Sequence, residues 1–135
     1  LRLIAGLEAP DAGEIVYQDV VIASRQARIC LPPEKRQMGM VFQSYAIWPH
    51  MTVFDNAAFP LQVSRKSIPK REIESRVHRV LKVVALDEMA DREATKLSGG
   101  QQQRLALARA LVMEPPLLLL VSPRLRAKRE EAFNE

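Results

Sequence analysis

The stretch Leu97-Ser-Gly-Gly-Gln-Gln-Gln-Arg-Leu-Ala-Leu-Ala-Arg-Ala-Leu111 is the most informative part of this sequence. Its Ala, Leu, Gln and Arg residues favour helix, and Ser98 is suited to cap the helix N-terminus. Gly99 and Gly100 leave backbone N–H groups uncovered by side chains at the end where the helix dipole is positive. The stretch therefore predicts a helix near residues 99–112 whose first turn can bind phosphate. A glycine-rich helix start without any ligand has the same local pattern.

The composition is that of an ordinary globular domain. The 135 residues are 47% hydrophobic and 27% charged, which excludes collagen-like, mucin-like and disordered classes. The longest apolar run, Leu117 to Val121, is far shorter than the roughly 20 residues that cross a bilayer. One cysteine, Cys30, forms no intramolecular disulfide and fits a reducing compartment. A net charge of +4 attracts nucleic acid, acidic lipid or phosphate without choosing among them.

The N-terminal third predicts a short helix end followed by strands. The chain opens like the last turn of an amphipathic helix that ends at Gly6, so we expect it to be a fragment of a longer protein. Residues 14–17 and 20–22 are β-prone runs separated by two residues, which is typical of a hairpin. Residues 24–37 are polar and predict a solvated loop. Residues 38–42 predict a short buried strand.

The rest of the chain predicts helices and one more strand. Thr52 is a suitable N-cap for a short helix over 53–60 that stops at Pro60, and residues 87–96 predict an irregular segment. A helix over 70–85 carries an apolar stripe, and residues 117–121 predict a strand buried on both faces. The stripe consists of Ile73, Val77, Val80, Leu81 and Val84, and the core face near 99–112 of Leu97, Leu105, Ala108, Leu111 and Val112. This order of elements predicts an α/β layered domain interrupted by a helical section.

The stretch quoted first resembles the signature motif of ATP-binding-cassette (ABC) ATPases. The likeness continues along the chain. Leu1–Gly13 is similar to the helix and turn that follow the family's phosphate-binding loop, and Val41-Phe-Gln43 resembles the Q-loop. Pro49–Asn56 resembles the start of the helical subdomain in importer-type subunits. The resemblance thus implies an importer-type ATP-binding subunit.

The resemblance also implies a fold class and a division of the chain. The fold class is α/β, a partial P-loop NTPase (ABC ATPase) core with a helical subdomain inserted. Residues 1–43 and 113–135 correspond to remnants of the α/β core, and residues 44–112 correspond to the helical subdomain with the signature motif.

ATP and Mg²⁺ are the cofactors that the resemblance implies. It places Gln43 on the metal and attacking-water side of the γ-phosphate; without the neighbouring match, Gln43 would merely end a strand. It gives Trp48–Met51 a place near the groove that receives a membrane subunit, whereas an aromatic and a histidine packed in a loop would look the same. The residues that contact ATP held by a partner subunit are Ser98, Gly99, Gly100 and Gln101.

Two catalytic motifs of the family are missing or altered in these 135 residues. No GxxxxGK[ST] loop, which cradles the β- and γ-phosphates, occurs in the sequence. The strand before Val121 resembles the start of a Walker B motif, but its Asp and Glu positions are Val121 and Ser122. Without these carboxylates no catalytic residue of the family is intact, so we expect a version that is inactive alone.

These observations are compatible with three functions. The first is an ATP-binding and ATP-hydrolysing subunit that energises solute import. It would pair head to tail with a second ABC ATPase subunit and reach the inner face of the cell membrane from the cytoplasm through permease subunits. The second is a non-catalytic protein that pairs with an intact subunit. The third is a nucleic-acid-binding module, which is disfavoured because the basic pairs Lys35-Arg36, Arg65-Lys66 and Lys70-Arg71 lack interleaved aromatics. The sequence does not specify the solute.

Overall fold

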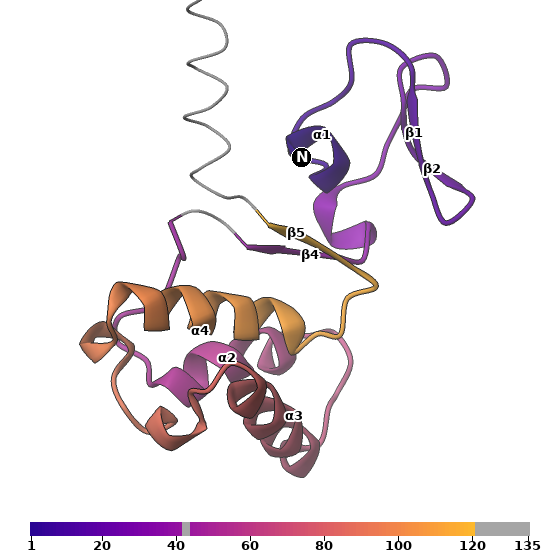
Figure 1. The fold of residues 1–135 in the computed structure, drawn as a ribbon. Coiled ribbons are helices and arrows are strands. Elements are labelled where there is room, and N and C mark those ends of the chain that lie inside the picture. Colours follow the sequence, from indigo (N-terminus) through magenta and orange to yellow (C-terminus); the bar gives the residue numbers. More distant parts are fainter. Residues whose placement is uncertain (42–43, 121–135) are drawn as a thin grey trace, which may run out of the picture.

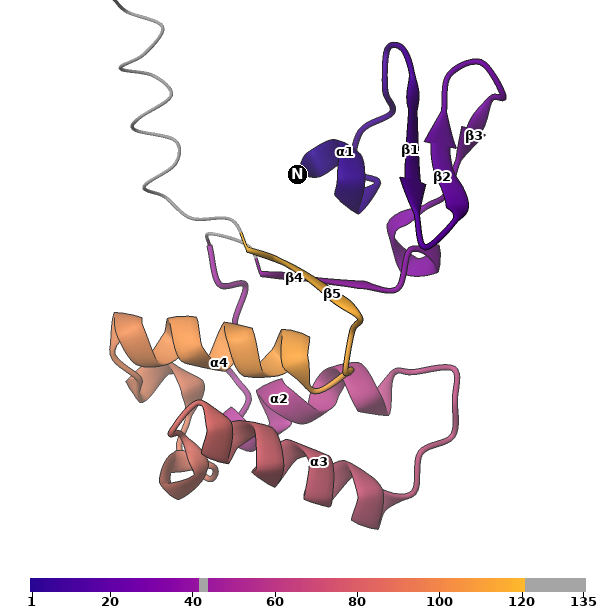
Figure 2. The ribbon, with the colours of Figure 1, turned by 45° about the vertical axis from the view of Figure 1, so that its right-hand side comes forward.

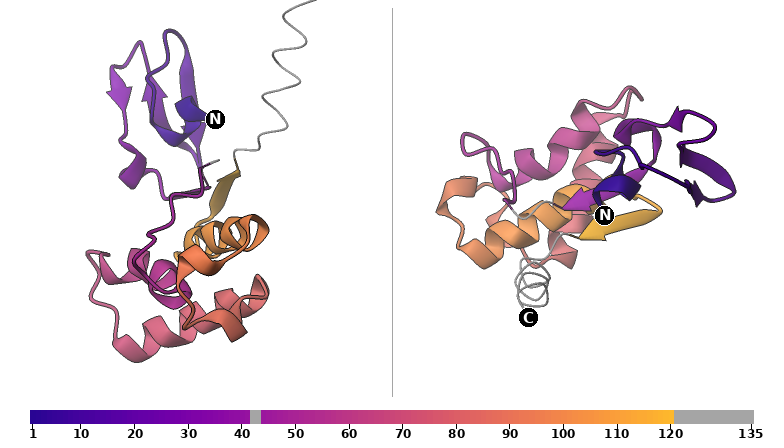
Figure 3. Two further views of the ribbon diagram at one scale, coloured as in Figure 1. Left: turned by 90° about the vertical axis from the view of Figure 1, so that its left-hand side faces the viewer. Right: turned by 90° about the horizontal axis from the view of Figure 1, so that it is seen from above.

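The computed structural model of the protein describes residues 1–41 and 44–120. Its helices are α1 (Arg2–Ala5), α2 (Val53–Gln62), α3 (Lys70–Val83) and α4 (Gly99–Leu111), with 3₁₀ turns η1 (Pro33–Lys35), η2 (Asp87–Met89) and η3 (Ala94–Lys96). Its strands are β1 (Glu14–Tyr17), β2 (Val20–Ser24), β3 (Ile29–Cys30), β4 (Met38–Val41) and β5 (Leu117–Leu120). Figure 1 shows α1 and the β1–β2 hairpin at one end, the β4–β5 pair in the middle and the helices α2, α3 and α4 at the other end. The view from the side in Figure 3 gives the same arrangement.

The N-terminal sheet has the order β1-β2-β3 and is antiparallel throughout (Figure 2). The predicted hairpin is confirmed: Gln18 and Asp19 form the two-residue connection, both with positive φ (49° and 62°). Such a connection matches the right-handed twist of the two strands. The expectation of a solvated loop over 24–37 is wrong in part. These residues contain β3 and η1, and the side chain of Arg36 near their end is buried.

Arg36 joins α1 to the neighbouring β segment. Its side chain is 2% exposed, and it donates to the carbonyls of Leu3 (2.7 Å), Ile4 (2.8 Å) and Leu31 (2.7 Å). Two of these carbonyls belong to α1, whose C-terminal end favours a positive charge. Gly6 ends this helix with φ 82°, and a Cβ there would lie 2.6 Å from Arg36 Nε. Glycine is therefore required at this position by both conformation and space.

Strands β4 and β5 form a parallel pair. Their register runs from Met38 opposite Leu117 to Val41 opposite Leu120, which confirms two strands at the predicted places within the described residues. The expectation that the first of them is buried is wrong, because all four residues of β4 are half-buried. Helix α4 packs against β4 (Figure 1). The expectation that the second strand is buried on both faces is wrong: only Leu119 is buried, Leu117 and Leu118 are half-buried and Leu120 is 54% exposed. Among the described strands β5 pairs with β4 alone, so one side of it is not covered by a neighbouring strand.

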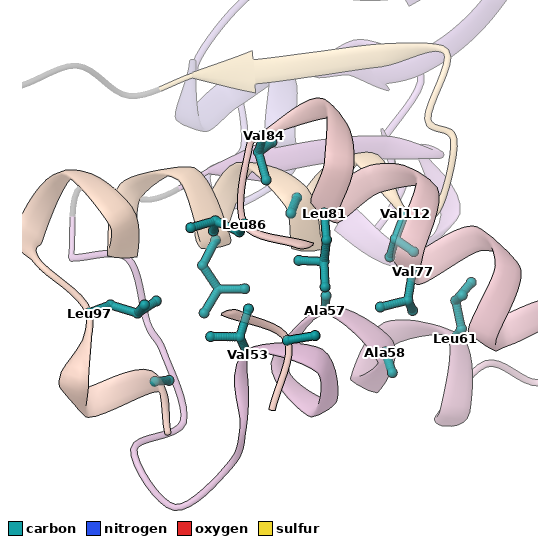
Figure 4. Packing of buried hydrophobic residues seen from close by; sticks show 14 residues of the cluster. Val53, Ala57, Ala58, Leu61, Val77, Leu81, Val84, Leu86, Leu97 and Val112 are labelled. Carbon is teal, nitrogen blue, oxygen red and sulfur yellow. The ribbon is translucent and has the colours of Figure 1, made fainter. Parts of the chain in front are cut away.

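The main apolar core lies between α2, α3 and α4 (Figure 4). The predicted stripe of α3 is confirmed: Val77, Leu81 and Val84 are buried, and Ile73 and Val80 pack against the core. The predicted core face of α4 is likewise confirmed, except that Leu111 is half-buried. The cluster of buried side chains consists of Val53, Ala57, Ala58, Leu61, Val77, Leu81, Val84, Leu86, Ala90, Ala94, Leu97, Leu105, Ala108 and Val112.

Helix α2 begins where predicted but ends two residues later than predicted. Thr52 caps it as expected, since its hydroxyl accepts from the Asp55 N–H at 3.0 Å. The helix does not stop at Pro60 but continues to Gln62. A proline in the last turn removes a single backbone hydrogen bond, and the burial of Leu61 (2% exposed) offsets that loss.

The segment expected to be irregular, residues 87–96, contains η2 and η3. Ala90 and Ala94 are buried there and belong to the helical core. The small side chains allow the chain to pass close under α2, where Val53 N donates to the Arg92 carbonyl at 2.9 Å. None of the helices in the described ranges combines the length and apolar character needed to span a membrane.

Candidate functional site

The first turn of α4 is organised by a reciprocal pair of hydrogen bonds. The Gln101 N–H donates to the Ser98 hydroxyl at 3.3 Å, and the Ser98 N–H donates to the Gln101 side-chain oxygen at 2.8 Å. This capping box satisfies two N–H groups that the helix itself leaves without partners. The predicted cap by Ser98 is confirmed. The part that Gln101 plays in it was not foreseen, although a Ser followed three residues later by Gln is a known signature of this motif.

Both the oxygen and the nitrogen of the Gln101 side-chain amide form hydrogen bonds within the protein. Besides accepting from Ser98, it donates through Nε2 to the Met89 sulfur at 3.4 Å. Ser98 is exposed, whereas Gln101 is half-buried. The structure thus brings the four predicted contact residues together in one turn, with Gln101 holding the turn from inside.

Gly99 and Gly100 lie exposed at the start of the helix. A Cβ built at either position would meet no atom within 4 Å in the part of the chain that the structure describes. Neither glycine has the positive φ that would favour glycine. Internal packing and backbone conformation therefore do not explain these glycines, and what they provide is access to the backbone.

The electrostatics of this turn favour an anion. The first N–H groups of a helix point outward and carry its partial positive charge. No acidic side chain occupies the first turn of α4. The turn can accordingly receive phosphate oxygens without displacing a carboxylate of its own.

The remaining predicted site residues, Gln43, Val121 and Ser122, lie outside the described residues. The strands that precede them end side by side, since Val41 and Leu120 form the last pair of the parallel ladder. Ligands of open α/β sheets bind beyond the carboxyl ends of such strands. Across residues 1–41 and 44–120, no group of three or more His, Cys, Asp or Glu side chains is placed to hold a metal ion.

The loop from Ser44 to Met51 connects this sheet edge to α2. Trp48 is half-buried and packs on Phe59 with ring centroids 4.4 Å apart, while His50 is exposed. The fully buried Asn56 of α2 accepts from the Trp48 N–H (2.9 Å) and donates to the Trp48 carbonyl (3.1 Å). The proximity of Trp48–Met51 to a groove for a membrane subunit stays a prediction.

Two residues of this region were missed by the sequence analysis, Asn56 and Arg109. A polar Asn within the apolar face of a helix is a signal that could have identified the first. Arg109 lies in the second half of α4, which is rich in Ala and Leu, and its guanidinium sits 4.5 Å from the centre of the Trp48 ring. Burial lowers the pKa of the Arg109 guanidinium from its ordinary value, but arginine stays protonated at neutral pH.

Solved structures of ABC ATPase cassettes share this α/β fold with its helical layer. The family model described as ABC transporter matches residues 1–123. The chain therefore belongs to the ABC transporter family.

The curated relatives are import ATP-binding proteins. The chain is 47% identical over 123 residues to the trehalose/maltose import ATP-binding protein MalK of Thermococcus litoralis, covering 91% of this chain and 32% of the relative. It is 50% identical over 125 residues to the sulfate/thiosulfate import ATP-binding protein CysA of Pectobacterium atrosepticum, covering 91% and 36%. The chain thus spans about a third of the length of these relatives.

Solved structures of ABC cassettes share the fold. The structure of cbiO1 from Clostridium perfringens, part of the ABC transporter complex cbiONQ, has a TM-score of 0.75 at 29% identity, covering 90% of this chain and 47% of that one. The dimeric ATP-binding cassette MJ0796 bound to ADP and Pi has a TM-score of 0.70 at 30% identity, covering 88% and 52%.

Proposed function

We propose that this chain acts within the ATP-binding subunit of a solute importer, where the N-terminal turn of α4 contacts ATP held by a second subunit. The observation that carries the proposal is the open space in front of Gly99 and Gly100, at a helix end without acidic side chains. The names of the relatives support import as the process, and the dimeric cassette bound to ADP and Pi supports pairing of two such subunits.

The first turn of α4 can supply only a small part of the free energy of ATP binding. A helix N-terminus stabilises a nearby anion by about 0.3–1 kcal/mol at an exposed site. That is too little to hold ATP, so the cradle for the β- and γ-phosphates must come from another segment or subunit.

The fit of the chain to Mg²⁺ is incomplete, because the two Walker B positions are Val121 and Ser122 and the described residues offer no acidic cluster. When bound, Mg²⁺ would neutralise phosphate charge, and Gln43 is the residue that we propose on that side.

The division of the chain and its location follow the same proposal. Residues 1–43 and 113–135 are assigned to the α/β core, and residues 44–112 to the helical subdomain. Permease subunits would hold the assembly at the cytoplasmic face of the membrane. The alternative function is a non-catalytic protein that pairs with an intact subunit and reduces its turnover.

A complementation experiment tests the phosphate contact. The partner is an intact relative whose own signature glycine is replaced by Asp, so that its turnover depends on signature residues supplied in trans. We expect this chain to restore phosphate release, Gly99→Asp to abolish the restoration, and Ser75→Asp to retain it. Gly99→Asp places a negative charge where the γ-phosphate approaches, whereas Ser75 is an exposed position on α3 that receives the same charge.

The possible results separate the two functions. Restoration that survives Gly99→Asp would overturn the proposed contact. If the chain instead lowers the turnover of an unmodified intact subunit and restores none in the disabled one, the non-catalytic alternative is correct.

A further inference from the structure

Arg109 connects two parts of the molecule that are far apart in the sequence. Its guanidinium donates to the carbonyl of Ala46 at 2.5 Å and to the carbonyl of Tyr45 at 3.0 Å, across 63 and 64 residues. The same group lies over the Trp48 ring, 4.5 Å from its centre. A planar guanidinium can bind two acceptors and stack on an aromatic face at once. One side chain of α4 thus contacts three residues of the Ser44–Met51 loop.

The backbone that Arg109 contacts adopts an uncommon conformation. Tyr45 and Ala46 have φ values of 56° and 44°, in the left-handed region that residues with a Cβ rarely adopt. The Ala46 N–H donates to the Ser44 carbonyl at 2.6 Å, which closes a tight three-residue turn. Such a turn persists only when surrounding contacts hold it, and Arg109 binds the carbonyls of both left-handed residues.

We propose that Arg109 is a positioning residue that ties the Tyr45–Trp48 loop to α4. The loop directly follows Gln43 in the sequence, and α4 carries Ser98–Gly100 at its other end. Arg109 comes eleven positions after Ser98, a rise of about 16 Å along the helix. A displacement of α4 at its nucleotide-facing end is therefore passed to the loop. The functional part of this inference rests on the proposed function.

A second arginine on the same helix provides a matched comparison. Arg104 donates to the carbonyls of Val84 (2.9 Å) and Ala85 (3.3 Å), and Ala85 also has a positive φ of 55°. Both arginines therefore bind a left-handed turn through two carbonyls. Only Arg109, of the two, binds the loop that follows Gln43.

The first experiment uses Trp48 as its reporter, because it is the only tryptophan of the chain. Acrylamide quenching of the purified chain is expected to rise at least about twofold in Arg109→Gln, since the guanidinium that covers one face of the ring is removed. Arg104→Gln should quench like the wild type, with circular dichroism verifying the fold of each variant. Unchanged quenching in Arg109→Gln, or an equal rise in Arg104→Gln, would overturn the proposal.

Arg109→Lys keeps the test decisive if Arg109→Gln fails to fold. A single ammonium group retains the charge but lacks the planar fork that binds two carbonyls while stacking on the ring. We expect a folded chain in which Trp48 is quenched more than in the wild type. Quenching equal to that of the wild type would show that the fork does not position the loop.

The second experiment examines whether ATP bound near Ser98–Gly100 changes the environment of Trp48 in the loop. It does not depend on the first experiment. The chain is paired with an intact relative whose tryptophans are replaced by phenylalanine, and ATP is added. We expect Trp48 emission to change in the wild-type pair and in Arg104→Gln, and the change to be largely lost in Arg109→Gln. If the change in Trp48 emission survives in Arg109→Gln, Arg109 does not pass a displacement of α4 to the loop. Absence of any response in the wild-type pair, with quenching as expected in the first experiment, would overturn the proposed function but not the positioning role.

Discussion

Ser98 combines an observed structural role with a proposed functional one. Its hydroxyl accepts from Gln101 N–H and so holds the first turn of α4 in place. The same residue is exposed beside Gly99 and Gly100, where the proposed phosphate contact lies. A hydroxyl can satisfy the cap through one lone pair and still face an anion through its proton.

The cap gives the first prediction. Ser98→Ala removes the acceptor for Gln101 N–H, and we expect the free energy of unfolding to fall by about 1 kcal/mol, the usual cost of losing such a cap. Ser98→Thr keeps the hydroxyl and should lose a smaller amount. Urea unfolding followed by circular dichroism measures both variants. Equal stability of Ser98→Ala and the wild type would show that the capping box contributes nothing to the fold.

Asn56 links the α2 element to the loop before it. Its side chain is fully buried, and its Nδ2 also donates to the Thr52 carbonyl at 2.9 Å. Together with Arg109 from α4, it holds Trp48 between two helices. The loop is therefore fastened to the helical layer through side chains of two separate elements.

Asn56→Ala is the second prediction. The substitution removes the acceptor of the Trp48 N–H, whereas the Trp48 carbonyl keeps the Met51 N–H as a donor. A buried group left unsatisfied costs about 1–3 kcal/mol. We expect a loss of stability of that size together with stronger quenching of Trp48. The control is Gln62→Ala at an exposed position of the same helix, which should change stability by less than about 0.5 kcal/mol. A stable Asn56→Ala chain with unchanged Trp48 quenching would contradict this account of the loop.

At the scale of the whole chain, the proposed contact with ATP is present while the phosphate-binding pattern does not occur in these 135 residues. The 135 residues contain the signature turn and lack the GxxxxGK[ST] pattern, and their Walker B positions are apolar or neutral. Catalysis of phosphoryl transfer depends on positioning the phosphates and neutralising their charge. In these 135 residues neither the phosphate-binding loop nor the Walker B carboxylates occur to do so.

The third prediction concerns the chain alone. We expect calorimetry to show weak or no ATP binding, and phosphate-release assays to show no hydrolysis. Val121→Asp combined with Ser122→Glu should not restore turnover, because the cradle and its lysine are still missing. Restoration should require the phosphate-binding segment of a relative to be fused as well. A low-micromolar dissociation constant, or turnover by the double variant alone, would contradict the prediction.

Contiguous sequence patterns were enough to predict α3, the start of α4 and the family. The apolar spacing of 70–85 and the Ser98 cap predicted α3 and the start of α4, because helices bury one face at a fixed period and end at residues that satisfy free N–H groups. The signature stretch determined the relationship to ABC ATPases for a similar reason, since its residues are contiguous.

How distant segments are joined depends on contacts that no local pattern specifies. Arg36 lies in a polar segment, yet it is buried because carbonyls of α1, more than 30 residues away, receive its guanidinium. Helix α2 passes Pro60 because Leu61 packs in the core, and Arg109 reaches the Tyr45 carbonyl across 64 residues. A long side chain has the same local sequence context whether it points to water or to a carbonyl on another element. The partner, and with it the role of the residue, exists only once the elements have packed together.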